Sequence, residues 1–215
     1  SDARSAYQNQ HLSYRLADEL RQSSDDLTRL ARTFVLTADN LYEEQYRAVL
    51  DIRNGKAPRP EHYERIYWDF VAADGIKPRP DGKAVPLQQL MEEQGFTAEE
   101  FARLKEAQAN SDSLVRLETV AMNAVKGLFD DGKGHFTRKG EPDMALARQL
   151  MHSREYHAEK AKIMKPIDEF FSMLDRRTSS EVQRLVQRSY RLFYTLLALV
   201  GLAVLTLIAL CTSVF

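Results

Sequence analysis

Two arginines, Arg29 and Arg32, stand three residues apart in a helix-favouring stretch and close to its apolar side. A guanidinium group binds a carboxylate or another anion through two parallel hydrogen bonds. The pair therefore predicts either an anion-binding site in a cleft between helices or local ion pairs with acidic neighbours such as Asp25 and Asp26. The sequence leaves both interpretations open.

Polar residues on a second long helix supply the other half of the predicted site. Ser111 and Glu118 fall on the apolar stripe of this helix, and Asp112 lies beside it. Burying such a group unpaired costs about 1–3 kcal/mol. We therefore expect these residues either to pair with Arg29 and Arg32 across a helical bundle or to line a hydrated cleft that binds a ligand.

An aromatic cluster around Tyr67 and Trp68 lies between two Gly- and Pro-containing breakers at residues 53–60 and 74–82. Such a cluster is typical of a small satellite core, but aromatic rings with polar tips also form ligand pockets. The binding hypothesis makes Tyr67 and Trp68 a lid. The full predicted ligand-binding set is Arg29, Arg32, Tyr67, Trp68, Ser111, Asp112 and Glu118.

No pattern in the sequence indicates catalysis or a metal centre. His152 and His157 are five residues apart, which places them on different faces of a helix. The segment from Asp130 to Glu141 has the length of a calcium loop, but glycines occupy two ligand positions and His135 stands where glycine is needed. No nucleotide-binding glycine motif or nucleophile elbow occurs. We therefore predict no enzymatic activity, no cofactor and no metal.

Composition narrows the classes of partner. Lys and Arg number 30 against 31 Asp and Glu, so no basic excess favours nucleic-acid binding. The one cysteine, Cys211, lies in the C-terminal apolar run, which leaves the preceding region without disulfides or cysteine ligands for zinc. Nucleic acid is therefore excluded as an expected partner.

Apolar spacing of three and four residues predicts an all-α protein. A single long helix is expected from about Ala3 to Ile52, and a second is expected to start at the Thr97–Glu100 capping box and end near residues 127–129. The expected architecture is an elongated antiparallel helical bundle, either one four-helix bundle or two stacked bundles. The remaining expected elements are short helices at about 61–73, 86–94 and 143–152, a turn or small hairpin at 130–137, and a last helix from about Arg154 onward with a kink near Pro166.

Residues 192–215 form an apolar run without charge or proline. As a helix the run reaches about 36 Å, enough to cross the roughly 30 Å hydrocarbon core of a bilayer. Tyr190, Phe193 and Tyr194 mark its start, where aromatic rings favour the headgroup level. The predicted domains are therefore a helical region over 1–191 and a transmembrane helix over 192–215.

Several segments together resemble the extracytoplasmic sensor region of bacterial methyl-accepting chemotaxis proteins. These segments are LTRLARTFVLTAD at 27–39, IRNGKAPRPEHYERIYWDF at 52–70, EAQANSDSLVRLETVAMNAVKG at 106–127 and KAKIMKPIDEFF at 160–171. Similar segments occur in sensor kinases and diguanylate cyclases, so the resemblance leaves the downstream output open.

The resemblance implies a chemoreceptor module in the bacterial inner membrane. Its periplasmic bundle would form a homodimer, detect a small molecule such as an anion or a periplasmic binding protein, and pass a helix shift through the membrane to a cytoplasmic signalling domain. Arg184, Arg188 and Arg191 precede the span, and by the positive-inside rule they favour the opposite orientation. The alternatives are a tail-anchored cytosolic protein and a structural scaffold or adaptor that binds a protein partner.

Overall fold

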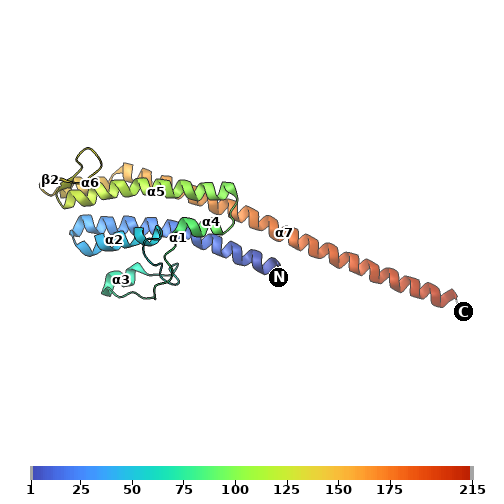
Figure 1. Cartoon of the computed structure of the whole chain (residues 1–215). Helices are drawn as coiled ribbons and strands as arrows, with labels where there is room; N and C mark the ends of the chain where they lie inside the picture. Colours follow the sequence, from blue (N-terminus) through green and yellow to red (C-terminus); the bar gives the residue numbers. More distant parts are fainter. Residues whose placement is uncertain (1, 214–215) are drawn as a thin grey trace.

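The computed structural model describes the backbone of residues 2–213, and the side chains of this range except 2–7, 74, 181–182 and 204–213. The described chain is mainly helical, which confirms the all-α prediction at that level (Figure 1). The helices are α1 (Asp2–Thr37), α2 (Asn40–Arg53), α3 (Trp68–Asp74), α4 (Leu87–Glu93), α5 (Ala98–Val125), α6 (Met144–His152) and α7 (Arg154–Ser213), and the strands are β1 (Leu128–Phe129) and β2 (Arg138–Lys139).

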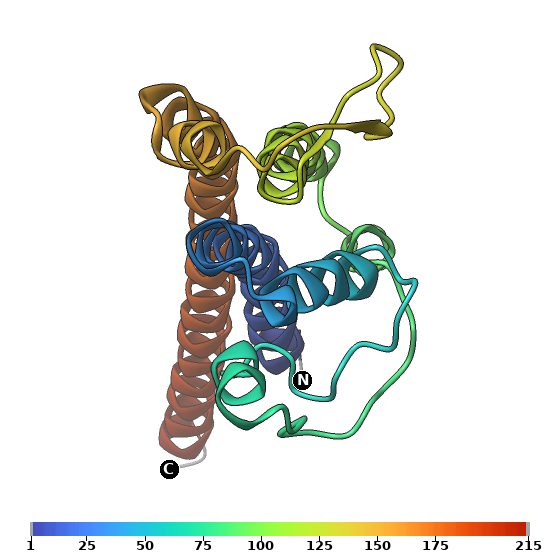
Figure 2. The same cartoon turned by 90° about the vertical axis from the view of Figure 1, so that its left-hand side faces the viewer.

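Helix α1 occupies the centre of the packed region, in contact with α2, α4, α5, α6 and α7. Helices α5 and α7 pack against each other along a second seam. In the end-on view, α2 and α3 lie on one side of α1, and α5 and α6 lie on the other (Figure 2). The predicted seam of α1 is buried as expected from Leu16 to Phe34. The core therefore follows α1 for most of its length.

The predicted single helix over 3–52 is wrong, because the chain reverses at Ala38 and forms the α1–α2 hairpin (Figure 1). Ala38 has a φ of 56°, in the left-handed region, and its N–H donates to Phe34 O at 2.7 Å. Asp39 then caps α2 by accepting a hydrogen bond from Leu41 N at 3.0 Å. Alanine rarely adopts a positive φ, and no glycine or proline stands at this position. The sequence therefore carries no sign that the helix ends here.

The predicted helix over 61–73 is shorter than expected, since α3 begins at Trp68. Residues 58–83 instead form a closed loop, in which Pro60 and Asp81 form an isolated bridge and Arg59 N donates to Lys83 O at 3.0 Å. His62 has a φ of 52°, which is incompatible with a continuous helix. Tyr67 and Trp68 of this loop region line a cleft with α2, whereas Tyr63 lies beside Leu16 and Glu19 of α1.

The second half of the chain matches its sequence signals closely. The Thr97–Glu100 capping box is present, with Glu100 N donating to Thr97 Oγ1 at 3.2 Å and Thr97 N to Glu100 Oε2 at 2.9 Å. The expected turn is a small hairpin that pairs β1 with β2. Asp131 accepts backbone N–H groups of Lys133 and His135. These contacts use one of its carboxylate oxygens to close the turn.

Helix α7 passes through Pro166 without a break, and a neighbouring helix supplies the missing donor. A proline cannot donate to the carbonyl four residues earlier, here Lys162 O. The side chain of Asn110 on α5 donates to that oxygen at 2.9 Å. The α5–α7 contact therefore stabilises α7 at the position where a kink was expected.

The last residue of α7 that is buried in the described structure is Leu174, and the helix then projects well beyond the other helices (Figure 1). Among the described residues, no helix combines the length and the apolar character needed to cross a membrane. The membrane helix predicted over 192–215 is not found there, and residues 204–215 of that prediction lie outside the residues whose side chains are described.

Replacing Ala38 with glycine should stabilise the protein. Glycine adopts the left-handed conformation without the steric cost that alanine bears, so we expect the free energy of unfolding to rise by about 0.5–1 kcal/mol. Urea denaturation followed by circular dichroism measures the change. The matched control Ala109→Gly, at an exposed position inside α5, should lower it by about 1 kcal/mol. A loss of stability in Ala38→Gly would contradict the hairpin at this residue.

Candidate functional site

The side chain of Glu118 is the centre of a polar cluster inside the helical core. Glu118 on α5 is 1% exposed. Its Oε2 accepts a hydrogen bond from the hydroxyl of Tyr46 on α2 at 2.7 Å, and its Oε1 accepts one from the hydroxyl of Tyr156 on α7 at 2.6 Å. One carboxylate therefore connects three helices that are far apart in the sequence.

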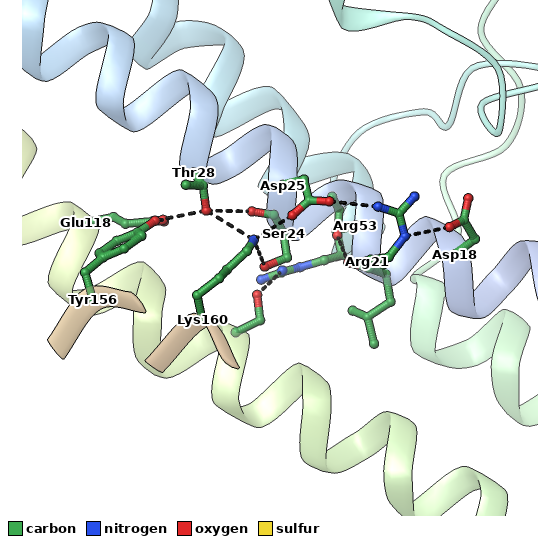
Figure 3. A network of polar contacts seen from close by, with 12 residues as sticks. Asp18, Arg21, Ser24, Asp25, Thr28, Arg53, Glu118, Tyr156 and Lys160 are labelled. Carbon is green, nitrogen blue, oxygen red and sulfur yellow. Dashed lines mark hydrogen bonds and ion pairs between the residues drawn. The ribbon is translucent and has the colours of Figure 1, made fainter. Parts of the chain in front are cut away.

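Helix α1 joins this cluster through Thr28 and the ammonium group of Lys160 on α7 (Figure 3). The Tyr156 hydroxyl lies 2.9 Å from Thr28 Oγ1; a phenol has one proton, so it donates to only one of Thr28 and Glu118 at a time. Lys160 Nζ donates to Ser24 Oγ at 2.8 Å and pairs with Asp25 Oδ1 at 3.0 Å. We call Ser24, Asp25, Thr28, Tyr46, Glu118, Tyr156 and Lys160 the Glu118 network.

Burial shifts the acid–base balance of the network. Desolvation raises the pKa of Glu118 above its usual range, although both tyrosine hydroxyls and the charges of Lys160 and Arg53 act in the opposite direction. Desolvation also lowers the pKa of Lys160, against the attraction of Asp25. The charged forms of Glu118 and Lys160 are therefore stabilised by a few specific side chains instead of by water.

Arg53, the last residue of α2, is the buried cation that the sequence analysis missed. It is 2% exposed, and its Nη1 donates to Ser111 Oγ at 2.8 Å while its Nη2 donates to Asp112 Oδ1 at 2.8 Å. Its Nε is buried and has no hydrogen-bond partner among the described side chains, and desolvation lowers the pKa of Arg53. Ser111 and Asp112 are thus paired with an arginine, as one interpretation required, but with a different one.

Arg29 and Arg32 do not contact Ser111, Asp112 or Glu118 as the predicted pairing required. Arg29 is partly exposed and pairs with Asp26 on its own helix at 3.1 Å, which is the local alternative. Arg32 Nε donates to Met151 O at the end of α6 at 3.0 Å.

The guanidinium of Arg32 nevertheless borders the Glu118 network. It lies over the ring of Tyr156, with Cζ 4.8 Å from the centroid, and its Nη2 is buried with no hydrogen-bond partner in the part of the chain that the structure describes. Tyr156 in turn donates to Glu118, so one aromatic ring separates Arg32 from the buried carboxylate. The predicted contact between Arg32 and Ser111 is not formed, because the α1–α2 hairpin places Arg53 beside Ser111.

Tyr67 and Trp68 line a separate cleft on the other side of α2. Their rings meet edge to face at 5.1 Å, and Trp68 Nε1 donates to the Tyr63 hydroxyl at 2.7 Å. The cleft has a volume of about 310 Å³. It is lined by Leu41, Glu44, Gln45, Ala48, Ile52, Ala57, Pro58, Tyr67, Trp68, Val71, Gly75, Lys77 and Asp81. These two aromatic residues therefore form walls of their own cleft and do not cover the arginines of α1.

Helix α2 connects the cleft with the Glu118 network. Gln45 lines the cleft, and the next residue, Tyr46, donates to Glu118. Within the described part of the chain, no group of three or more His, Cys, Asp or Glu side chains is placed to hold a metal ion. The arrangement offers hydrogen bonding and an apolar cleft, which are the properties of a binding module.

Comparison of the chain with protein-family profiles, curated proteins and solved structures found no match. The functional assignment therefore depends on the geometry and on the sequence.

The raised pKa of Glu118 predicts a specific pH dependence of stability. Between its ordinary pKa of about 4.3 and the higher value in the fold, the folded state binds more protons than the unfolded state. The contribution of Glu118 to stability is therefore greatest below the ordinary pKa and declines as pH rises through the folded pKa. Urea denaturation of the native chain and of Glu118→Gln at several pH values measures it. The difference in unfolding free energy, native minus variant, should fall as pH rises, and a flat or rising difference would contradict the assignment.

Proposed function

We propose that this chain is the sensing module of a bacterial transmembrane chemoreceptor, with residues 1–191 as a periplasmic helical domain and residues 192–215 as a membrane helix. The observation that supports it most is the extent of α7. The same unbroken helix carries Tyr156 and Lys160 into the Glu118 network and continues beyond the packed region to Ser213. A shift of this helix is the physical output that such a module requires.

The exposed surface of α7 supports a lipid partner for its C-terminal part. Large apolar side chains there are half or more exposed, and no charged side chain interrupts them between 192 and 203. They are Leu192, Phe193, Tyr194, Leu196, Leu197, Leu199, Val200 and Leu202. Apolar area in water costs about 25 cal/mol per Å², so a helix with this surface gains free energy by entering a bilayer. In the proposed receptor the module lies in the bacterial inner membrane.

The Glu118 network supplies a mechanism by which packing changes reach α7. Interfaces between helices switch between discrete arrangements because cores are close-packed. At this level, Tyr46 on α2 and Tyr156 on α7 bind the two oxygens of the same carboxylate. A displacement of α2 that alters one hydrogen bond changes the electrostatics of the other, and α7 responds. We also propose that the receptor is a homodimer. The α7 helices of the two subunits would then lie side by side.

The proposed output is chemotaxis signalling through a cytoplasmic domain, and the same input would serve a sensor kinase or a diguanylate cyclase. The module itself would carry out no catalysis. Its signal would be a neutral or charged small molecule, or a periplasmic binding protein.

Arginine substitutions in the apolar part of α7 test the membrane proposal. Leu199 and Leu202 are 63% and 60% exposed, and each arginine near the centre of a span costs about 2.5–3.5 kcal/mol. The double variant Leu199→Arg/Leu202→Arg should move most of the full chain from the membrane fraction of expressing bacteria to the supernatant. The control Ile66→Arg/Phe70→Arg adds the same charge at two exposed apolar positions, one just before α3 and one within it, and should stay in the membrane. Equal partitioning of both variants would refute the proposal.

A receptor chimera tests signal transfer. Residues 1–215 are joined to the cytoplasmic region of a chemoreceptor with a known kinase output, and kinase activity is measured in isolated membranes. Tyr156→Phe removes the hydroxyl between Glu118 and Thr28 but keeps the ring. We expect it to change basal kinase activity about five-fold or more, a typical magnitude for coupling between sites. Tyr42→Phe, on α2 outside the network, is the control, and equal outputs from the two variants would support a scaffold role instead.

A further inference from the structure

Within the described structure, the side-chain amide of Gln45 has no hydrogen-bond partner, and its N and O atoms are shielded from solvent. The residue is 4% exposed. Its Nε2 and its Oε1 are both buried, and neither has a partner among the described residues. Buried amides in folded proteins are almost always paired, so an unpaired donor and acceptor on the same group point to a missing partner.

The place of Gln45 in the fold shows where such a partner would come from. The residue belongs to the lining of the cleft beside α2 and α3. The cleft borders this residue, so a molecule that occupies the cleft can supply the missing hydrogen bonds once the carboxamide, whose N and O atoms have almost no accessible surface in the unliganded fold, turns toward it. The volume of about 310 Å³ matches the lower end of the range for small-molecule sites, which suits one small ring system.

The walls and the rim of the cleft restrict the chemistry of its occupant. The rings of Tyr67 and Trp68, which are 3% and 5% exposed, provide flat apolar surface. Among the described lining residues Lys77 is the one basic residue, and Asp81 pairs with it at 2.7 Å. An anion would therefore meet no free cation here, in contrast to the anionic ligand expected at Arg29 and Arg32. The cleft favours a neutral, flat molecule.

We propose that this cleft binds a small neutral heterocycle with a cis-amide edge, such as a lactam or a pyrimidine base, and that Gln45 reads that edge. A carboxamide presents a donor and an acceptor side by side. A cis-amide presents the complementary pair, so Gln45 Nε2 donates to the ligand carbonyl and Gln45 Oε1 accepts the ligand N–H. A ring without the N–H leaves Gln45 Oε1 unpaired and is rejected.

Occupation of this site is coupled to the Glu118 network through adjacent residues of α2. Gln45 lines the cleft, and Tyr46 donates to Glu118, which also accepts from Tyr156 on α7. This coupling rests on the proposed receptor function, whereas binding itself does not. Binding and membrane location are therefore measured separately.

The fluorescence of Trp68 provides a direct test, because it is the only tryptophan in the chain and its ring lines the cleft. The full chain in detergent is titrated with uracil, which carries cis-amide edges, and with 1,3-dimethyluracil, in which both N–H groups are blocked. We expect a saturable change of Trp68 emission with uracil and at least ten-fold weaker binding of 1,3-dimethyluracil.

Two glutamine variants separate recognition by Gln45 from general effects. Gln45→Leu keeps the size of the side chain and removes the unpaired amide, so it should fold with at least the native thermal stability and bind uracil at least ten-fold more weakly. Gln89→Leu removes an exposed glutamine amide on α4, outside the cleft, and should bind uracil as the native chain does.

Three results would overturn the proposal: no saturable response to uracil in the native chain, equal binding of the two ligands, or native uracil affinity in Gln45→Leu. If that variant fails to fold, the comparison of the two ligands on the native chain still decides. Uracil binding by a chain that fails to partition into membranes would leave the site intact and refute the receptor function instead.

Discussion

The buried carboxylate of Glu118 constrains the rest of the packed region. An ionised group removed from water must obtain its solvation from the protein, and here two tyrosine hydroxyls provide it. Each hydroxyl comes from a different helix, so the separations of α2, α5 and α7 are fixed to within the tolerance of a hydrogen bond. Thr28 and Lys160 extend the same requirement to α1. An apolar layer at this level would tolerate sliding of helices, whereas this polar layer favours a small number of defined arrangements.

Helix α7 is the element through which such an arrangement can be communicated. Its N-terminal part is held by the polar layer and by apolar packing down to Leu174, and Asn110 satisfies the carbonyl that Pro166 leaves without a donor. Beyond Arg177, which pairs with Glu100 of α5 at 3.0 Å, the helix extends away from the packed region while remaining continuous (Figure 1). In the proposed receptor, a rigid helix with one end packed in the core and the other end free of it would convert a local repacking into a displacement at a distance. The proposed receptor function uses this property.

Helix α2 separates two environments of opposite character. One side contributes Tyr46 to the charged network, and the other contributes Gln45 to an apolar cleft closed by Tyr67 and Trp68. The tight turn at Ala38 makes this possible, because it folds α2 back along α1. As part of one extended helix, the same residues would continue away from the bundle. Arg53 would then have no access to Ser111, and the cleft would lose one wall.

Local signals in the sequence were enough to determine the helical class, the Thr97–Glu100 cap, a turn after α5 and the start of α7 at Arg154. Each of these features depends on contacts between residues close in the chain or on the spacing of apolar residues along a helix. They also identified Ser111 and Glu118 as buried polar residues. The tertiary structure alone decided which partners these residues have, since Arg53 and Tyr46 approach them only after the chain reverses at Ala38, a residue type that carries no turn signal. It likewise decided that Tyr67 and Trp68 belong to a cleft of their own. Partner choice depends on which helices meet, and that is set by the summed packing of the whole core.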